Sequence, residues 1–104
     1  MASLQKKNRL HCCGRWSAAT PPLVEAAGTG DWSVVRGGAG IWTSTMAVGI
    51  DILERCIFVA SRVVSTQASV VAGGTDTTFV VNNTSDAAAA TDSAIDFLVI
   101  RTGG

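Results

Sequence analysis

Short runs of apolar and β-branched residues, separated by Gly, Asp, Asn and Ser, make up most of the chain from residue 28 onwards. The clearest of these runs span residues 31–36, 41–46, 56–64, 68–72, 77–82 and 92–101. Runs of this length, bounded by turn-forming residues, are typical of β-strands. Their spacing of about 10–15 residues leaves no room for repeated helices, so the pattern predicts an all-β fold, an antiparallel β-sandwich.

The last run has a polar lead at Asp92 and Ser93, followed by mostly apolar residues up to Ile100. This pattern predicts a strand that is buried on both faces and therefore lies in the middle of a sheet. Two segments do not have a strand pattern. For residues 48–55 we expect one helical turn or an irregular crossing, and for residues 83–92 a loop with room for one helical turn.

Residues 1–27 differ from the rest, because neither the helix period nor the strand period holds there for more than a few positions. The Pro21-Pro22 pair favours an extended path. A disordered tail is one interpretation, but large apolar side chains in this segment would be unfavourable in water. These side chains are Leu10, Trp16, Leu23 and Val24. We therefore predict an extended N-terminal arm over residues 1–27 that contacts a partner through them, and a sandwich domain over residues 28–104.

The composition limits the classes of partner. Hydrophobic residues make up 47% of the chain and charged residues 15%, against about 25% charged in a typical soluble domain. Much of the surface must therefore be small polar residues or be covered by another subunit. A net charge of zero argues against nucleic acid, although the basic residues within 6–15 suit an acidic partner surface. No apolar run reaches the length of a membrane span or forms a signal peptide, so we expect no membrane partner, synthesis in the cytoplasm and reduced cysteines.

The candidate metal ligands do not have the spacing of a known site. His11, Cys12 and Cys13 are consecutive, whereas zinc sites separate paired ligands by roughly two to four residues. His11 is the single histidine, so a cysteine nucleophile would have no second imidazole as its base. Cys56 falls in a predicted strand, where a small buried Cys is common. The glycine clusters lack the phosphate-loop pattern. We therefore predict no metal ion and no cofactor.

Three carboxylates near the C-terminal end are close in sequence: Asp86, Asp92 and Asp96. A pair of carboxylates that performs acid–base catalysis needs a shared cleft and separated pKa values, neither of which the sequence indicates. We interpret Asp92 as a turn residue and Asp96 as a polar residue at the start of a strand. The sequence therefore predicts no catalytic residues and a protein that is not an enzyme.

Four runs together resemble a recurring module of bacteriophage virion proteins. They are Val-Arg-Gly-Gly-Ala-Gly-Ile-Trp-Thr at 35–43, Cys-Ile-Phe-Val-Ala-Ser at 56–61, Thr-Phe-Val-Val-Asn at 78–82, and 92–101. The resemblance covers roughly two thirds of the chain and departs from the module at Ile95, where an aromatic residue is usual. It implies a jelly-roll-like sandwich of the kind found in trimeric globular heads on tail-fibre tips and capsid surfaces, with no catalytic residues.

Three roles are compatible with this reading. The first is a capsid decoration (cement) protein, a homotrimer that contacts the major capsid protein on the virion surface after synthesis in the host cytoplasm. We rank it above a tail-fibre or receptor-binding tip, because only a short segment without heptads precedes the predicted sandwich. The third is a small glycan-binding module, for which the aromatic candidates are Trp16, Trp32 and Trp42, although core packing is the expected role of at least Trp42.

Overall fold

The structure is a computed structural model that describes residues 9–63, 65–71, 74–85 and 89–102. The elements within these ranges are β1 (Arg9–Trp16), β2 (Val24–Thr29), β3 (Trp32–Gly38), β4 (Ile41–Met46), the 3₁₀ helix η1 (Ile52–Glu54), β5 (Arg55–Ser61), β6 (Thr66–Val70), β7 (Thr78–Ser85) and β8 (Ile95–Arg101). The predicted all-β fold is confirmed.

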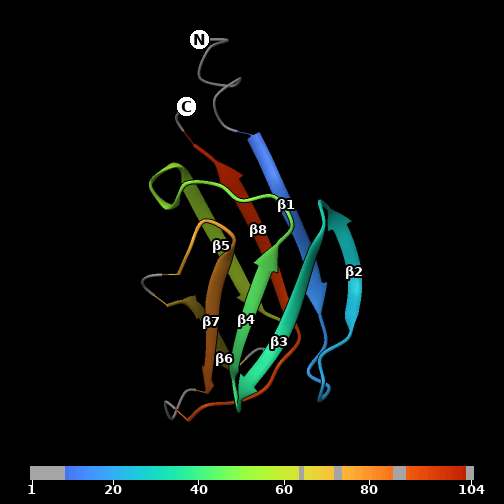
Figure 1. Cartoon of the computed structure of the whole chain (residues 1–104). Helices are drawn as coiled ribbons and strands as arrows, with labels where there is room; N and C mark the ends of the chain where they lie inside the picture. Colours follow the sequence, from blue (N-terminus) through green and yellow to red (C-terminus); the bar gives the residue numbers. More distant parts are fainter. Residues whose placement is uncertain (1–8, 64, 72–73, 86–88, 103–104) are drawn as a thin grey trace.

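The strands form two antiparallel sheets that pack against each other as a β-sandwich (Figure 1). Sheet A has the strand order β2-β1-β8-β5, and sheet B has the order β3-β4-β7-β6. The chain makes one hairpin in each sheet, β1–β2 and then β3–β4. It then crosses to sheet A at β5, returns to sheet B for β6 and β7, and crosses again to β8. The predicted antiparallel β-sandwich is therefore confirmed.

The N-terminal stretch is part of the sandwich rather than an arm. β1 pairs with β2 on one side and with β8 on the other, so it is an interior strand of sheet A. The register shifts between Leu10 and Cys12, at a β-bulge or similar irregularity. An irregularity of this kind breaks the alternation of inward and outward side chains, which is why the strand period was not visible in the sequence. The predicted boundary at residue 27 is therefore wrong for residues 9–27, and residues 1–8 lie outside the described residues.

Strand β8 lies in the middle of sheet A, between β1 and β5. Its burial alternates, with Ile95, Phe97 and Val99 fully buried between the sheets and the intervening residues partly exposed. The predicted central position is confirmed. The predicted burial of both faces is not, because no second layer in the described part of the chain covers the outer face of this strand. At the end of the sheet, Arg101 of β8 pairs directly with Arg9 of β1.

Aromatic rings from both sheets meet in the core. Trp16 at the end of β1 has no exposed surface. Its ring centroid lies 6.0 Å from that of Trp42 on β4 and 5.6 Å from that of Phe97 on β8. Phe79 on β7 is 5.6 Å from Phe97 as well. Aromatic pairs at such distances contribute about 0.5–1.5 kcal/mol beyond the area they bury, so these contacts hold the two sheets in a fixed relative position.

The connection that leads into β8 is fixed to sheet B by hydrogen bonds. The amide of Asn83 donates to the Gly40 carbonyl at 2.8 Å, and its side-chain Nδ2 donates to the Thr91 carbonyl at 2.7 Å. Residues 89–94 contain a single β-bridge, between Thr84 and Ala90, and no helix. Part of the loop predicted at 83–92, residues 86–88, lies outside the described residues.

The irregular crossing predicted at 48–55 contains the one-turn helix η1. Asp51 caps its N-terminus, because its side chain accepts a hydrogen bond from the Leu53 amide at 2.9 Å. The Glu54 carbonyl accepts from the Thr102 hydroxyl at 3.1 Å. These bonds attach the crossing to the end of β8, next to the end of the sandwich where β1 begins.

Candidate functional site

The structure separates the four predicted partner contacts into two groups. Leu10, Leu23 and Val24 are exposed, at 48%, 63% and 49% of their surface, and are therefore available to another molecule. Trp16 is 0% exposed and packs in the core. The prediction that Trp16 contacts a partner is therefore wrong, because its side chain points inward from β1 and fills the space between the sheets.

The outer face of sheet A carries a continuous set of apolar side chains. We call it the apolar face and define it by Leu10, Cys13, Cys56, Phe58, Leu98 and Ile100. Directly paired residues on adjacent strands place their side chains on the same face. One row runs across the sheet from Leu10 through Ile100 to Cys56, and the next from Cys13 through Leu98 to Phe58. All six side chains are exposed or partly exposed.

The alternation of β5 and β8 explains how this face arises. Ile57 and Val59 of β5 pack towards the core, so Phe58 between them points outward and is 52% exposed. In β8 the inward residues are apolar, but Leu98 and Ile100 on the outward side are apolar as well. A strand in a half-solvated antiparallel sheet normally alternates apolar with polar residues, and these two strands do not.

Charged residues border the apolar face at both of its ends. Asp96 forms an ion pair with Arg15 at 2.6 Å and a longer one with Arg62 at 3.7 Å. At the opposite end, Arg101 lies 3.4 Å from Glu54. These side chains are partly exposed, and such surface pairs contribute at most about 1 kcal/mol to stability. They do, however, neutralise much of the charge at the margins of the face.

The outer face of sheet B has a different character. Its outward residues on the two central strands are mostly hydroxyl and amide side chains. They are Thr43 and Thr45 on β4 and Thr78, Asn82 and Thr84 on β7. The edge strand β6 adds Gln67 and Ser69, whereas Val35, Ile41 and Val80 are the apolar exceptions on this face. This is the solvated face that an antiparallel sandwich usually presents.

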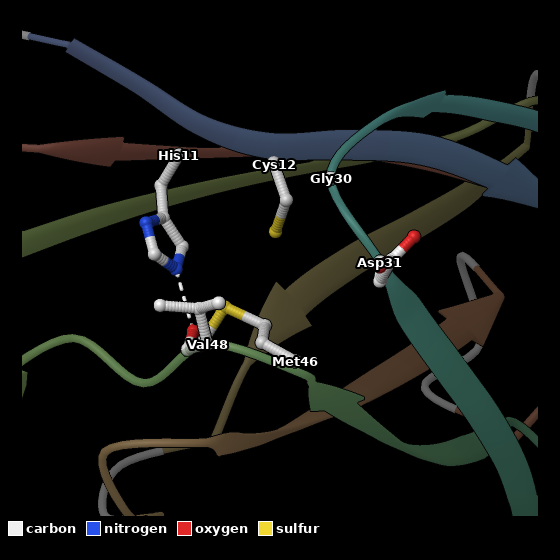
Figure 2. Close-up of a pocket in the computed structure, with 6 residues that line it drawn as sticks. All are labelled: His11, Cys12, Gly30, Asp31, Met46 and Val48. Atoms are coloured by element: carbon white, nitrogen blue, oxygen red, sulfur yellow. Dashed lines mark hydrogen bonds between the residues drawn. The ribbon is translucent and has the colours of Figure 1, made fainter.

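A cavity of about 250 Å³ lies between β1 and the end of β4 (Figure 2). It is lined by His11, Cys12, Gly30, Asp31, Met46 and Val48. The imidazole Nε2 of His11 donates a hydrogen bond to the Val48 carbonyl at 2.7 Å and so links the two sheets. Figure 2 shows that the Asp31 carboxylate points away from His11, so this carboxylate is not oriented as a partner for the imidazole.

Cys12 is not an activated nucleophile. Burial, with a smaller contribution from neighbouring Cys13, raises the pKa of the Cys12 thiol to about 11. A thiol with this pKa is protonated at neutral pH, whereas a nucleophilic cysteine needs the thiolate. The arrangement of His11 and Cys12 in this cavity is therefore not that of an activated cysteine site.

The predicted turn and strand-start carboxylates lie in separate environments. The hydrogen bond from the Arg36 guanidinium, reinforced by one from the Gly40 amide, holds the pKa of Asp92 below its ordinary value. Asp92 therefore acts as an ionised structural group beside the β3–β4 turn. Asp96 lies on the outer side of sheet A with Arg15, and Asp86 falls outside the described residues.

The described part of the chain contains neither a cluster of metal-ligating side chains nor a helix that could span a membrane. Among the residues with described positions, no three of His, Cys, Asp and Glu come together in a group that could hold a metal ion. In the same residues there is no helix with the length and apolar character needed to cross a bilayer.

The tryptophans do not form an exposed aromatic platform. Trp16 and Trp42 have no exposed surface. Trp32 is partly exposed, and its ring meets Phe97 edge-on with a centroid distance of 4.7 Å. Two of the three rings predicted as sugar contacts are therefore inaccessible.

Comparison with known proteins yields no relative: no protein-family model, curated protein or solved structure matches this chain. The fold defines the chain as an antiparallel β-sandwich protein. Its most distinctive surface is the apolar face, of which the sequence analysis had identified Leu10 alone. The available signal was the uninterrupted apolar run at 56–59, which lies within the strand predicted at 56–64.

Proposed function

We propose that this protein is a non-enzymatic virion structural protein, a capsid decoration protein that forms homotrimers on the phage head and ties neighbouring capsid subunits together. The observation that supports this most is the apolar face of sheet A. Monomeric proteins rarely expose large contiguous apolar patches, and those that occur commonly mark contacts with other proteins. A subunit of an assembly has this kind of surface, because its neighbours complete the burial.

The resemblance to phage virion modules supports the location on a virion. The four runs that carry it fall on β3 and β4, on β5, on β7 and on β8. These strands include the central pair of sheet B and the central strand β8 of sheet A. The resemblance therefore falls on strands that form the frame of the sandwich.

The decoration role requires a second surface, which contacts the major capsid protein. Leu23 and Val24 are suited to it, because both are exposed large apolar residues where the β1–β2 connection enters the edge strand β2. This edge is separated from Phe58 on β5 by the two inner strands of the sheet. One subunit can therefore bind the capsid and another subunit at the same time.

Co-expression with the major capsid protein encoded nearest to this chain tests the proposal. We expect the protein to sediment with assembled shells, and the double variant Leu23→Gln/Val24→Gln to remain in the supernatant. Val35→Gln is the matched control, since Val35 is a similarly exposed strand residue on the other sheet. Failure of the native protein to bind shells overturns the decoration role. Immunogold labelling of tails instead of heads would establish the fibre-tip role.

A further inference from the structure

We infer that copies of this chain associate with one another through the apolar face of sheet A. The inference deepens the proposed function, because it names the surface that joins the subunits. The role of this contact in a virion rests on the proposed function. Its physical evidence is separate, since it comes from the side chains of β1, β5 and β8 alone.

The two outer faces of the sandwich differ in a way that selects one of them for association. Sheet B presents mostly Thr, Ser, Asn and Gln side chains, which water solvates well, with Val35, Ile41 and Val80 as apolar exceptions. Sheet A presents two adjacent rows of apolar side chains, and the outermost of them, Phe58, keeps 52% of its surface exposed. Burial of apolar surface stabilises an association by roughly 25 cal/mol per Å². The stabilisation available is therefore concentrated on sheet A.

Phe58 lies beside a shallow groove that can receive a side chain. The groove has a volume of about 190 Å³ and runs between β5 and β8, where Phe58, Ala60, Asp96 and Leu98 contribute to its walls. Interfaces obtain much of their binding energy from aromatic anchors that fill such depressions. The ring and the groove supply both parts of the contact, so around a three-fold axis each copy can place its Phe58 ring against the groove of the next copy.

The charges around the face favour a second copy over a charged partner. The carboxylates Asp96 and Glu54 are each paired with arginine within the same chain, and the chain has no net charge. Nucleic acid or an anionic membrane would need a basic surface. A second apolar face with similarly paired margins meets neither strong repulsion nor an unpaired buried charge, so an identical chain fits this surface.

The size of the face limits how tightly copies can associate. Three strands about 4.8 Å apart, with about seven residues rising 3.3 Å each, cover roughly 14 by 23 Å. A standard interface buries about 800 Å² of accessible surface on each partner. The whole accessible surface of this chain is 5935 Å². The face is therefore smaller than the area that a standard interface takes from one partner. We expect an association that depends on protein concentration.

The labelling rates of two cysteines on the apolar face can be used to detect this contact. Cys13 and Cys56 are partly exposed there, while Cys12 is buried between the sheets. In an assembly through this face, Cys13 and Cys56 become covered, so a maleimide reagent should modify both of them more slowly as protein concentration rises. Cys12 is the internal reference, because its exposure is the same in a single copy and in an assembly.

The experiment measures the molar mass of the full chain by light scattering over a range of concentrations, together with maleimide labelling of each cysteine. We expect the native protein to approach three times the single-chain mass of 10.7 kDa, with labelling of Cys13 and Cys56 slowed several-fold. Phe58→Gln should remain a single chain with concentration-independent labelling. Val35→Gln should behave as the native protein does. Circular dichroism of both variants establishes that the fold is kept.

Two results would overturn the inference: a native protein that stays at single-chain mass at all concentrations, or a Phe58→Gln variant that associates as the native protein does. Neither result depends on binding to capsid shells, which Leu23 and Val24 test separately. A protein that associates through the apolar face but does not bind shells retains this inference and loses the decoration role.

Discussion

Arg36 and Asp92 lie far apart in the sequence, yet both the Nε and the Nη2 of Arg36 contact one carboxylate oxygen of Asp92, at 3.0 and 2.9 Å. The second oxygen of Asp92 accepts a hydrogen bond from the Gly40 amide at 2.7 Å. One carboxylate therefore joins the end of β3, the β3–β4 turn and the segment that leads into β8. The position of the last strand depends in part on this contact with the opposite sheet.

Asp92→Asn should lower the free energy of unfolding at pH 7 by about 1.5–3 kcal/mol, the usual range for a hydrogen bond to a charged group. The pKa of Asp92 in the folded protein is lower than in the unfolded chain, where it is about 3.9. The stabilisation is therefore present above that value and is lost as the pH falls through the folded-state pKa. Urea denaturation of both proteins at neutral and acidic pH measures this, and a difference that stays constant with pH would contradict the assignment.

Trp16→Ala should destabilise the protein by about 3–5 kcal/mol, since the substitution leaves a large cavity among the core aromatic residues. Leu23→Ala is the control: Leu23 is exposed on the same β1–β2 unit and should change stability by less than about 0.5 kcal/mol. Thermal or urea denaturation distinguishes the two. Similar small effects for both variants would support an N-terminal arm outside the core.

Gly40→Ala should destabilise the turn that receives Asp92. Gly40 has φ +66°, a left-handed conformation that costs a residue with a Cβ about 1–2 kcal/mol. The added Cβ would also lie 2.5 Å from the Asn83 carbonyl oxygen and 2.7 Å from the Thr91 amide nitrogen, which adds a steric cost.

The matched control for Gly40→Ala is Gly38→Ala in the neighbouring strand. A Cβ at Gly38 meets nothing within 4 Å, so its effect should be small. Chemical denaturation of the two variants compares the positions directly. Equal stabilities would show that the tight approach at Gly40 does not constrain the fold.

Cys12 should be the slowest of the three thiols to react with a disulfide reagent at pH 7. Its burial and its pKa of about 11 both reduce the amount of accessible thiolate. Its rate should still be rising as the pH approaches 11. Quenching the reaction at different times and analysing the peptides by mass spectrometry gives the rate of each thiol. In denaturant, the three thiols should react at similar rates. Fast labelling of Cys12 in the folded protein would contradict its position in the core.

The strands after residue 28 could be predicted because their patterns are regular. The run at 41–46 coincides with β4, and those at 77–82 and 92–101 contain most of β7 and β8. β1 could not be predicted in this way, since the irregularity between Leu10 and Cys12 shifts its alternation. Pro21 and Pro22, which suggested an extended arm, instead lie in the connection that turns β1 back into β2.

The partner surface could be predicted only in part. Leu10, Leu23 and Val24 stood out because large apolar residues are unexpected in a segment without a clear period. The sequence did not identify Phe58 and Leu98 as surface residues. An apolar residue between two core residues gives the same sequence pattern whether its side chain is covered by a second layer or exposed to solvent. Sequence alone does not show that β5 is an edge strand and that the outer side of β8 has no second layer.

The pairing of Arg9 with Arg101 makes the first and last described strands neighbours along their whole length. A short linker from Thr102 to Arg9 would therefore close the described chain into a ring without moving any strand. New ends can then be opened in the exposed connection at Ala18–Thr20, where few contacts cross. Such a circular permutant would keep every pairing of both sheets and would place its ends beside Leu23, at the surface assigned to the capsid. A tag or binding domain fused there would lie at the surface proposed to contact the shell, away from the apolar face proposed to join the copies.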